Sequence, residues 1–227
     1  MSGILHSIRN SAYKGVIEAL LVSNGVSLFL FAARVAGGAS TRFWFLIWNL
    51  ILAWLPLLFA WLLVKRLKTN RWRQPMSIFL GVLWLGFLPN SFYLVSDLIH
   101  LHVTGEVNVL YDAVMFTSFI FNGYVAGFMS LYLVHGALLK RFSYHAVNLI
   151  VGGVLLACSY AIYLGRVLRW NTWDVLVNPA GVLFDLSEQV VNPISHPQLF
   201  MTTVTFFLLL SSMYFVIWRL IRALRAK

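Results

Sequence analysis

The feature that most constrains the fold is a series of long apolar stretches, separated by segments that carry most of the charge. Five of them are long and apolar enough to span a membrane as helices. A sixth, residues 15–36, is nearly so, although it also contains Glu18 and Asn24. A helix needs about 20 apolar residues to cross the hydrocarbon core of a bilayer. The sequence therefore predicts an all-α, polytopic integral membrane protein with six transmembrane helices.

We expect a single membrane domain over residues 1–227. Its expected spans are residues 15–36, 43–64, 76–97, 109–139, 146–168 and 200–220.

Basic and acidic residues fall on opposite sides of these spans. If the N-terminus lies in the cytoplasm, 13 of the 17 Lys and Arg residues are cytoplasmic and six of the seven acidic residues are outside. The four outer basic residues are Arg34, Arg42, Arg166 and Arg169. An excess of Lys and Arg in cytoplasmic loops sets the orientation of a membrane protein. With six spans, we expect both termini in the cytoplasm and most of the reactive side chains at the outer face.

The composition excludes an ordinary soluble domain. The chain is 60% hydrophobic and 11% charged, whereas about a quarter of the residues of a soluble domain are charged. A net charge of +10 in a soluble protein would indicate nucleic acid as a partner. Here the basic residues flank apolar spans and face anionic headgroups, so we expect the lipid bilayer as partner and no nucleic acid. Cys158 is the single cysteine, which excludes an intramolecular disulfide and a cysteine metal cluster.

Residues 169–199 form the one sizeable outer segment, between the fifth and sixth spans. Asn178 followed by Pro179 is typical of a helix start. Apolar residues at helical spacing follow, and a second Asn-Pro pair ends the run at Pro193. This pattern predicts a short amphipathic helix at the interface, or a re-entrant one.

The third span carries the most concentrated set of polar residues. Asn90, Tyr93, Asp97 and His100 are spaced by 3, 4 and 3 residues, which places them along one stripe of a helix. Polar groups are costly in lipid, so we expect the stripe to face the bundle interior. Asp97 and His100 could bind a metal ion or form an acid/base pair. The alternative is that they cap the helix at the water interface.

More acidic and histidine side chains follow closely. His102, Glu106 and Asp112 could complete the shell of a Zn or Mn ion begun by Asp97 and His100. The set that we consider for a metal is Asp97, His100 and His102, although its spacing matches no established metal motif. Asp112 is also a catalytic candidate, because it lies at the mouth of the fourth span.

A second set of polar residues ends the fifth span. Arg166 and Arg169 lie one helical turn apart at the outer face, against the trend of the other basic residues. Arginines in this position need an anionic partner, for which Asp97, Asp112 and Asp174 are available. A bound phosphate or carboxylate is the alternative, because guanidinium binds such groups through two hydrogen bonds.

These considerations give two groups of candidate residues. The catalytic candidates are Asp97, His100 and Asp112. The candidates for substrate binding are Asn90, Tyr93, Arg166, Arg169, Asn171 and Asp174.

Two motifs resemble those of a known family. They are FLPNSFYLVSDLIHL at residues 87–101 and GRVLRWNTWD at residues 165–174. Both are similar to segments of an uncharacterised integral-membrane family catalogued as domain of unknown function 1361. The resemblance implies a multi-pass protein of the bacterial inner (plasma) membrane, and it implies no particular reaction.

Three functions remain open at this point. The first is a hydrolase or transferase that acts at the outer face on a lipid or a lipid-linked anionic substrate. The second is a non-catalytic assembly or accessory protein in which the Arg-Asp-His cluster is structural. The third is a transporter of a small anion, or one coupled to protons. Because the chain has no inverted repeat, a transporter would need a homo-oligomer.

Overall fold

The computed structural model describes residues 2–69, 71–103, 105–167, 177, 180–181 and 197–225. Within these ranges, side chains are described for residues 14–224. Most of the outer segment 169–199, with its predicted amphipathic or re-entrant helix, lies outside the described residues.

The described chain is helical. Its elements are α1 (Ser2–Ala36), α2 (Phe45–Arg66), α3 (Pro75–Tyr93), the 3-10 helix η1 (Leu94–His100), α4 (Val109–Leu138), α5 (Tyr144–Val167) and α8 (Pro197–Arg225). Six helices in the described part of the chain are long and apolar enough to cross a membrane, the third of them continuing through η1 to His100. The predicted all-α fold with six spans is therefore confirmed.

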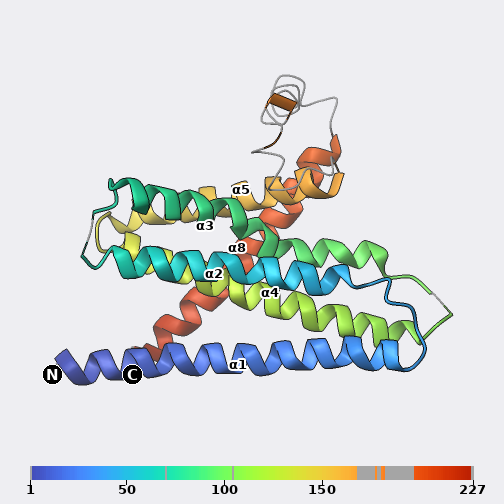
Figure 1. Cartoon of the computed structure of the whole chain (residues 1–227). Helices are drawn as coiled ribbons and strands as arrows, with labels where there is room; N and C mark the ends of the chain where they lie inside the picture. The colour runs from blue at the N-terminus through green and yellow to red at the C-terminus, as the bar shows by residue number, and fades with distance from the viewer. Residues whose placement is uncertain are drawn as a thin grey trace.

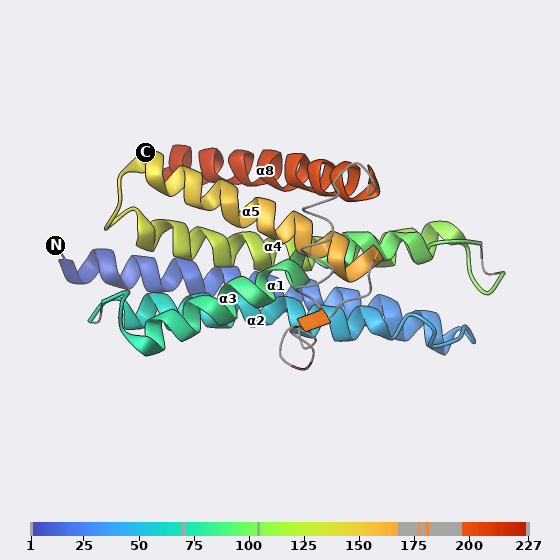
Figure 2. The ribbon, with the colours of Figure 1, turned by 90° about the horizontal axis from the view of Figure 1, so that it is seen from above.

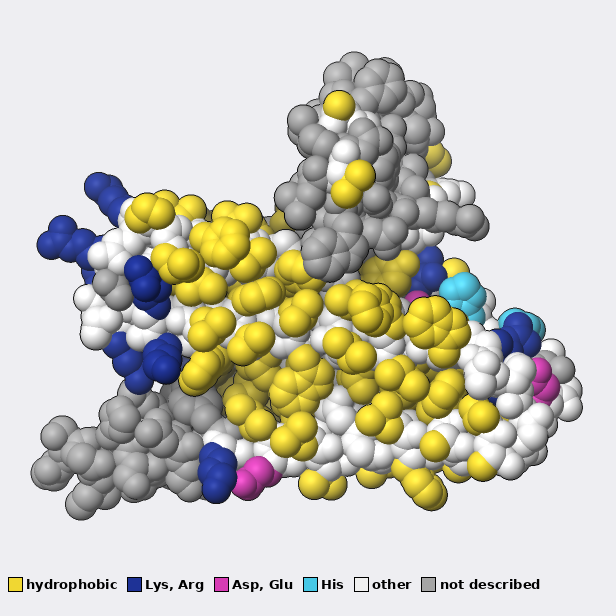
Figure 3. Space-filling model, in the orientation of Figure 1, with side chains coloured by type: hydrophobic (Ala, Val, Ile, Leu, Met, Phe, Trp, Pro, Cys, Tyr) yellow, Lys and Arg dark blue, Asp and Glu magenta, His cyan; other side chains and the backbone are white. Residues whose placement is uncertain are grey.

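The helices run alongside one another, and the two ends of the chain lie at the same end of the bundle (Figure 1). We call this the basic end, because the α2–α3 turn with its Lys and Arg residues also lies there. The opposite end, which carries Asp97, Glu106 and Asp112, is the acidic end. The apolar flank between the two ends is visible in Figure 3, with Lys and Arg side chains gathered at the basic end. Such a flank is typical of a surface that faces lipid.

Two apolar clusters make up the described core. The larger one lies among α2, α3, α4, α5 and α8 and includes Leu88, Phe92, Phe128 and Leu155. The smaller one lies nearer the acidic end, where Phe43 packs edge-on against Phe116 with ring centroids 4.9 Å apart. The guanidinium carbon of Arg34 lies 4.6 Å from the centroid of the Phe43 ring, so this second cluster contacts the polar residues of the acidic end.

The end of α3 approaches α4 closely because α4 has glycines at two positions one turn apart. A Cβ added at Gly123 would lie 2.7 Å from the Ser91 carbonyl oxygen, and one at Gly127 would lie 2.7 Å from the Ser91 Cβ. Small residues four apart allow this kind of close packing between membrane helices. Ser91 also donates a hydrogen bond to the Ala53 carbonyl oxygen of α2, at 2.9 Å. These contacts fix the direction in which the chain enters η1.

A polar network holds α1 against α4 and α2 inside the apolar layer. Asn24 donates to the Asn122 side-chain oxygen at 3.2 Å, and Asn122 donates to Ser27 at 2.9 Å. The Trp54 indole donates to the Asn24 side-chain oxygen at 3.2 Å. Buried amides paired in this way satisfy groups that would otherwise be costly in lipid.

Candidate functional site

Arg166, in the last turn of α5, is the centre of a polar cluster formed with η1. Its Nη2 donates to Asp97 Oδ1 at 2.5 Å and to Ser96 Oγ at 2.6 Å. Its Nη1 lies 3.2 Å from His100 Nε2, and its guanidinium carbon lies 4.6 Å from the centroid of the Tyr93 ring. The structure thus brings the two sequence motifs together, and Asp97 is the carboxylate that pairs with Arg166.

Asp97 and Arg166 differ from an ordinary surface ion pair in their burial. The Asp97 side chain is 2% exposed and that of Arg166 is 17% exposed. The second carboxylate oxygen of Asp97 accepts a hydrogen bond from Asn49 of α2 at 2.8 Å. Both oxygens of Asp97 are therefore occupied, while the Arg166 side chain remains partly exposed.

The backbone of η1 determines which side chains reach Arg166. α3 ends at Tyr93, and residues three apart in a 3-10 helix lie directly above one another. Ser96 thereby joins the cluster, although the α-helical stripe expected from the sequence did not include it. Asn90 remains in α3, where its amide donates to the Phe87 carbonyl oxygen at 3.1 Å.

Two exposed side chains extend the cluster along the surface. Arg42 donates to His102 Nε2 at 3.1 Å, and His102 Nδ1 donates to the His100 carbonyl oxygen at 2.7 Å. Arg166, His100, His102 and Arg42 thus form a connected row, which we call the outer basic row. Its two arginines and two histidines face one carboxylate, Asp97, in the described structure.

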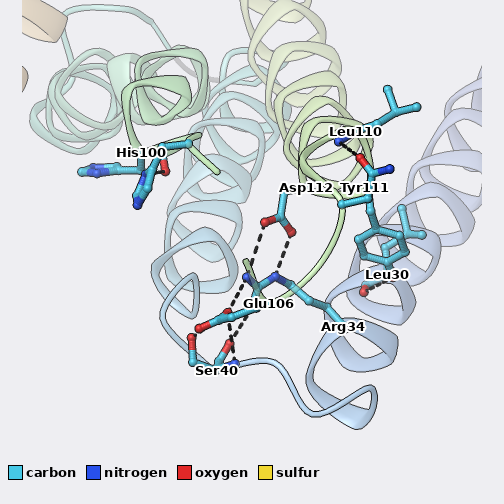
Figure 4. Close-up of polar contacts among 10 residues, drawn as sticks. Leu30, Arg34, Ser40, His100, Glu106, Leu110, Tyr111 and Asp112 are labelled. Atoms are coloured by element: carbon cyan, nitrogen blue, oxygen red, sulfur yellow. Dashed lines mark hydrogen bonds and ion pairs between the residues drawn. The ribbon is translucent and has the colours of Figure 1, made fainter. Parts of the chain in front are cut away.

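A second ion-pair cluster ties α1 to α4 and lies apart from His100 (Figure 4). Arg34 donates from Nε to Asp112 Oδ1 at 2.8 Å and from Nη2 to Glu106 Oε2 at 2.9 Å. The Arg34 side chain is fully buried and that of Asp112 is 1% exposed. The Arg34 Nη1 donates to the Ser40 carbonyl oxygen at 2.6 Å. The sequence placed Arg34 at the outer face and did not identify its partner, although the acid at the start of α4 was a signal that could have found it.

Glu106, in the loop before α4, has a carboxyl group whose pKa is shifted by its hydrogen bonds. Its carboxylate accepts hydrogen bonds from the Ser40 hydroxyl at 3.0 Å and from the Ser40 backbone N–H at 3.3 Å. The Ser40 hydroxyl is the largest cause, and Arg34 adds a further hydrogen bond, so the pKa of Glu106 is lowered from its ordinary value of 4.5.

The residues considered for a metal ion make contacts with other side chains. Asp97 is bound by Arg166 and Asn49, and His102 faces Arg42. Among the described residues, no group of three or more His, Cys, Asp or Glu side chains could hold a metal ion. The geometry therefore gives the expected Zn or Mn site no support. The other substrate-binding candidates, Arg169, Asn171 and Asp174, lie outside the described residues.

These features define a class. The chain is a multi-pass membrane protein in which a partly buried arginine, carboxylate and histidine cluster lies at the acidic end of the bundle. It belongs to the family described as protein of unknown function (DUF1361), whose sequence model matches residues 48–212. The resemblance carried by the two motifs is thus confirmed. No curated protein and no solved structure matches the chain.

Proposed function

We propose that this protein is a membrane-embedded enzyme, a hydrolase or a transferase, of the bacterial inner membrane. It acts at the outer face on an anionic group of a lipid or of a lipid-linked substrate. The observation that supports this most is the geometry of Arg166, which Asp97 holds in place while its Nη1 lies 3.2 Å from the Nε2 of exposed His100.

The outer basic row has the charge and the donors that an anion needs. Asp97 neutralises Arg166, and Arg42 adds a further positive charge at the exposed edge. Guanidinium groups bind phosphate and carboxylate through parallel hydrogen bonds. An oxyanion at this edge takes up the Nη1 donor that faces His100.

His100 is the proton donor or acceptor in this proposal. Its side chain is exposed at the end of η1, so a substrate can reach it, and imidazole exchanges protons near neutral pH. Asp97 acts as a positioning residue, because both of its oxygens are bound by Arg166 and Asn49. Asp112 holds α1 to α4 through Arg34 and does not touch the substrate.

The remaining binding candidates lie close to this site along the chain. Arg169, Asn171 and Asp174 all follow Arg166 within eight residues. In our proposal they contact the polar part of the substrate.

Turnover in a lipid mixture tests the proposal. Purified protein in detergent is incubated with a total bacterial lipid extract, and lipid species and released phosphate are followed by mass spectrometry and phosphate assay. We expect wild type to change at least one anionic lipid and His100→Gln to lose the change at an unaltered unfolding temperature. His145→Gln, which alters an exposed histidine at the basic end, is the matched control and keeps the change. Equal turnover in His100→Gln and wild type would overturn the assignment of His100.

The Arg34 cluster favours a second candidate, a structural or accessory role without turnover. Its guanidinium is fully buried and its carboxylate partners come from α4 and the loop before it. Removing one partner of a buried pair destabilises a protein by about 3–5 kcal/mol. If this candidate is correct, Asp112→Asn and Asp97→Asn both lower the unfolding temperature, and no lipid changes with wild-type protein.

A further inference from the structure

A cavity of about 310 Å³ lies at the basic end, far along the bundle from the outer basic row. It opens between α4, α5 and α8, and α5 lies beside α8 along this part of the bundle (Figure 2). Its polar lining includes His135, Asn148, Ser211, Trp218 and Arg219. The volume is at the lower end of the range found for small-molecule sites.

Three of the residues that line the cavity each have a buried polar atom without a hydrogen-bond partner among the described residues. These atoms are His135 Nε2, Ser211 Oγ and Trp218 Nε1. His135 is 2% exposed, so its ring is buried well beyond nine-tenths. A buried polar group without a partner destabilises the folded protein. A molecule that hydrogen-bonds to these atoms therefore completes the site.

All three atoms act as donors. The Tyr214 hydroxyl lies 2.8 Å from His135 Nδ1, and a phenol is the stronger donor of such a pair. Tyr214 therefore donates to Nδ1, and the neutral ring carries its proton on Nε2. The indole N–H of Trp218 can only donate, and a serine hydroxyl donates readily. The complementary ligand is rich in acceptors.

The ring of His135 is held rigidly. It stacks on the Trp218 indole with centroids 3.7 Å apart and planes inclined by 4°. Together with the hydrogen bond from Tyr214, this contact fixes the direction of Nε2.

The charge and the apolar surface of the cavity lining restrict the chemical class of the ligand further. Arg219 is exposed at the cavity, and none of the described lining residues is acidic. Val151, Leu155 and Phe215 line the apolar part. An anionic group with an apolar attachment fits this combination, and basic pockets between membrane helices bind phospholipid headgroups in this way.

We propose that this cavity binds a phosphate group, carried by an anionic phospholipid of the adjacent leaflet or by a soluble phosphate compound. His135, Ser211 and Trp218 donate to the phosphate oxygens, and Arg219 supplies the positive charge. The site is independent of the function proposed for the acidic end.

The test measures equilibrium binding of labelled phosphatidylglycerol and of labelled inorganic phosphate to the full-length protein in neutral detergent. Gly152 lines the cavity and Gly153 is exposed beside it, and a Cβ added at either meets nothing within 4 Å. Gly152→Leu fills the cavity and Gly153→Leu is its matched control. We expect Gly152→Leu and Arg219→Gln to weaken binding at least about tenfold, since charge-assisted hydrogen bonds are lost, and Gly153→Leu to leave it unchanged.

A second pair of variants tests one of the hydrogen-bond donors by itself. Ser211→Ala removes one donor and weakens binding about threefold or more, whereas Ser212→Ala alters an exposed serine that bonds to the Leu209 carbonyl oxygen and has no effect. Binding of the phospholipid alone identifies the lipid headgroup as the source, and binding of both probes identifies any accessible phosphate. If neither probe distinguishes Gly152→Leu from Gly153→Leu, the proposal is wrong.

Discussion

At the scale of single residues, the burial of an ion pair determines what its loss does to the protein. Arg166 and Asp97 have side chains that are 17% and 2% exposed, whereas Lys14 and Glu18 are 78% and 62% exposed at a separation of 3.6 Å. An exposed pair contributes about 0–1 kcal/mol, because water and salt screen it. A buried carboxylate that loses its partner cannot be solvated in the same way.

We therefore expect Arg166→Gln to lower the free energy of unfolding by about 3–5 kcal/mol, because it leaves Asp97 charged and without its guanidinium. Lys14→Gln, the exposed control, changes it by less than about 1 kcal/mol. Denaturant unfolding in detergent, followed by circular dichroism, measures both. Equal small effects in the two variants would show that the Asp97 pair contributes no more than a surface pair.

The lowered pKa of Glu106 predicts that the stability of the folded protein depends on pH, in a direction that follows from its hydrogen bonds. Its pKa is lower in the folded protein than the ordinary value of 4.5, because Ser40 and Arg34 bind the charged form. The unfolded chain therefore binds the proton more readily, and this contribution to stability is full above pH 4.5 and is lost as the pH falls through the folded pKa. We expect the unfolding temperature of wild type to fall more steeply than that of Glu106→Gln below pH 4.5. Parallel curves for the two proteins would contradict the assignment.

At the scale of elements, the contact between α3 and α4 positions the whole of η1. Gly127 leaves no space for a side chain, since an added Cβ would lie 2.7 Å from Ser91 Cβ and 2.8 Å from a ring carbon of Phe92. η1, which carries Ser96 and Asp97, begins one residue after the end of α3 and therefore close to this helix crossing. Close backbone packing here is thus a condition for the geometry around Arg166.

We expect Gly127→Ala to lower the free energy of unfolding by about 1–3 kcal/mol, because an added methyl group overpacks the crossing. Gly136→Ala is the control in the same helix, where an added Cβ meets nothing within 4 Å. That variant is neutral or stabilising by up to about 1 kcal/mol, since alanine favours a helix over glycine. Thermal unfolding of both variants in one detergent measures the difference. A stable Gly127→Ala would mean that α3 and α4 are farther apart than described.

At the scale of the whole molecule, the distribution of basic residues predicts which end of the bundle faces the cytoplasm. Cys158 is the single cysteine and is fully buried, so an introduced cysteine can be labelled selectively. In intact bacterial cells, an impermeant maleimide is expected to label Val103→Cys at the acidic end and not Arg71→Cys at the basic end. Permeabilised cells should show labelling of both. The reverse pattern would invert the assignment of the outer face.

The sequence predicted the spans, because apolar length determines them, and sidedness placed Asp97 and Arg166 at one end of the bundle. It left Asp97, Asp112 and Asp174 open as partners of Arg166, and the structure pairs Arg166 with Asp97. It did not predict Asn49 as a partner of Asp97, since an asparagine within an apolar run is expected to face the bundle interior, but the sequence does not show which side chain it meets there. Nor did it pair Arg34 with Asp112. Sidedness determines the end of a helix at which a residue lies, while its partner depends on the rotation of each helix about its axis.

The central claim is that Arg166 and His100 recognise an anionic lipid group at the outer face. Photo-crosslinking tests it most directly, with a photoreactive residue in place of Ile99, which is 65% exposed beside His100, or of Ile78, which is 54% exposed in the first turn of α3 at the basic end. We predict that mass spectrometry finds anionic lipids enriched at position 99 relative to position 78, and that His100→Gln removes the enrichment. The same lipid composition at both positions, unchanged by His100→Gln, would contradict the account.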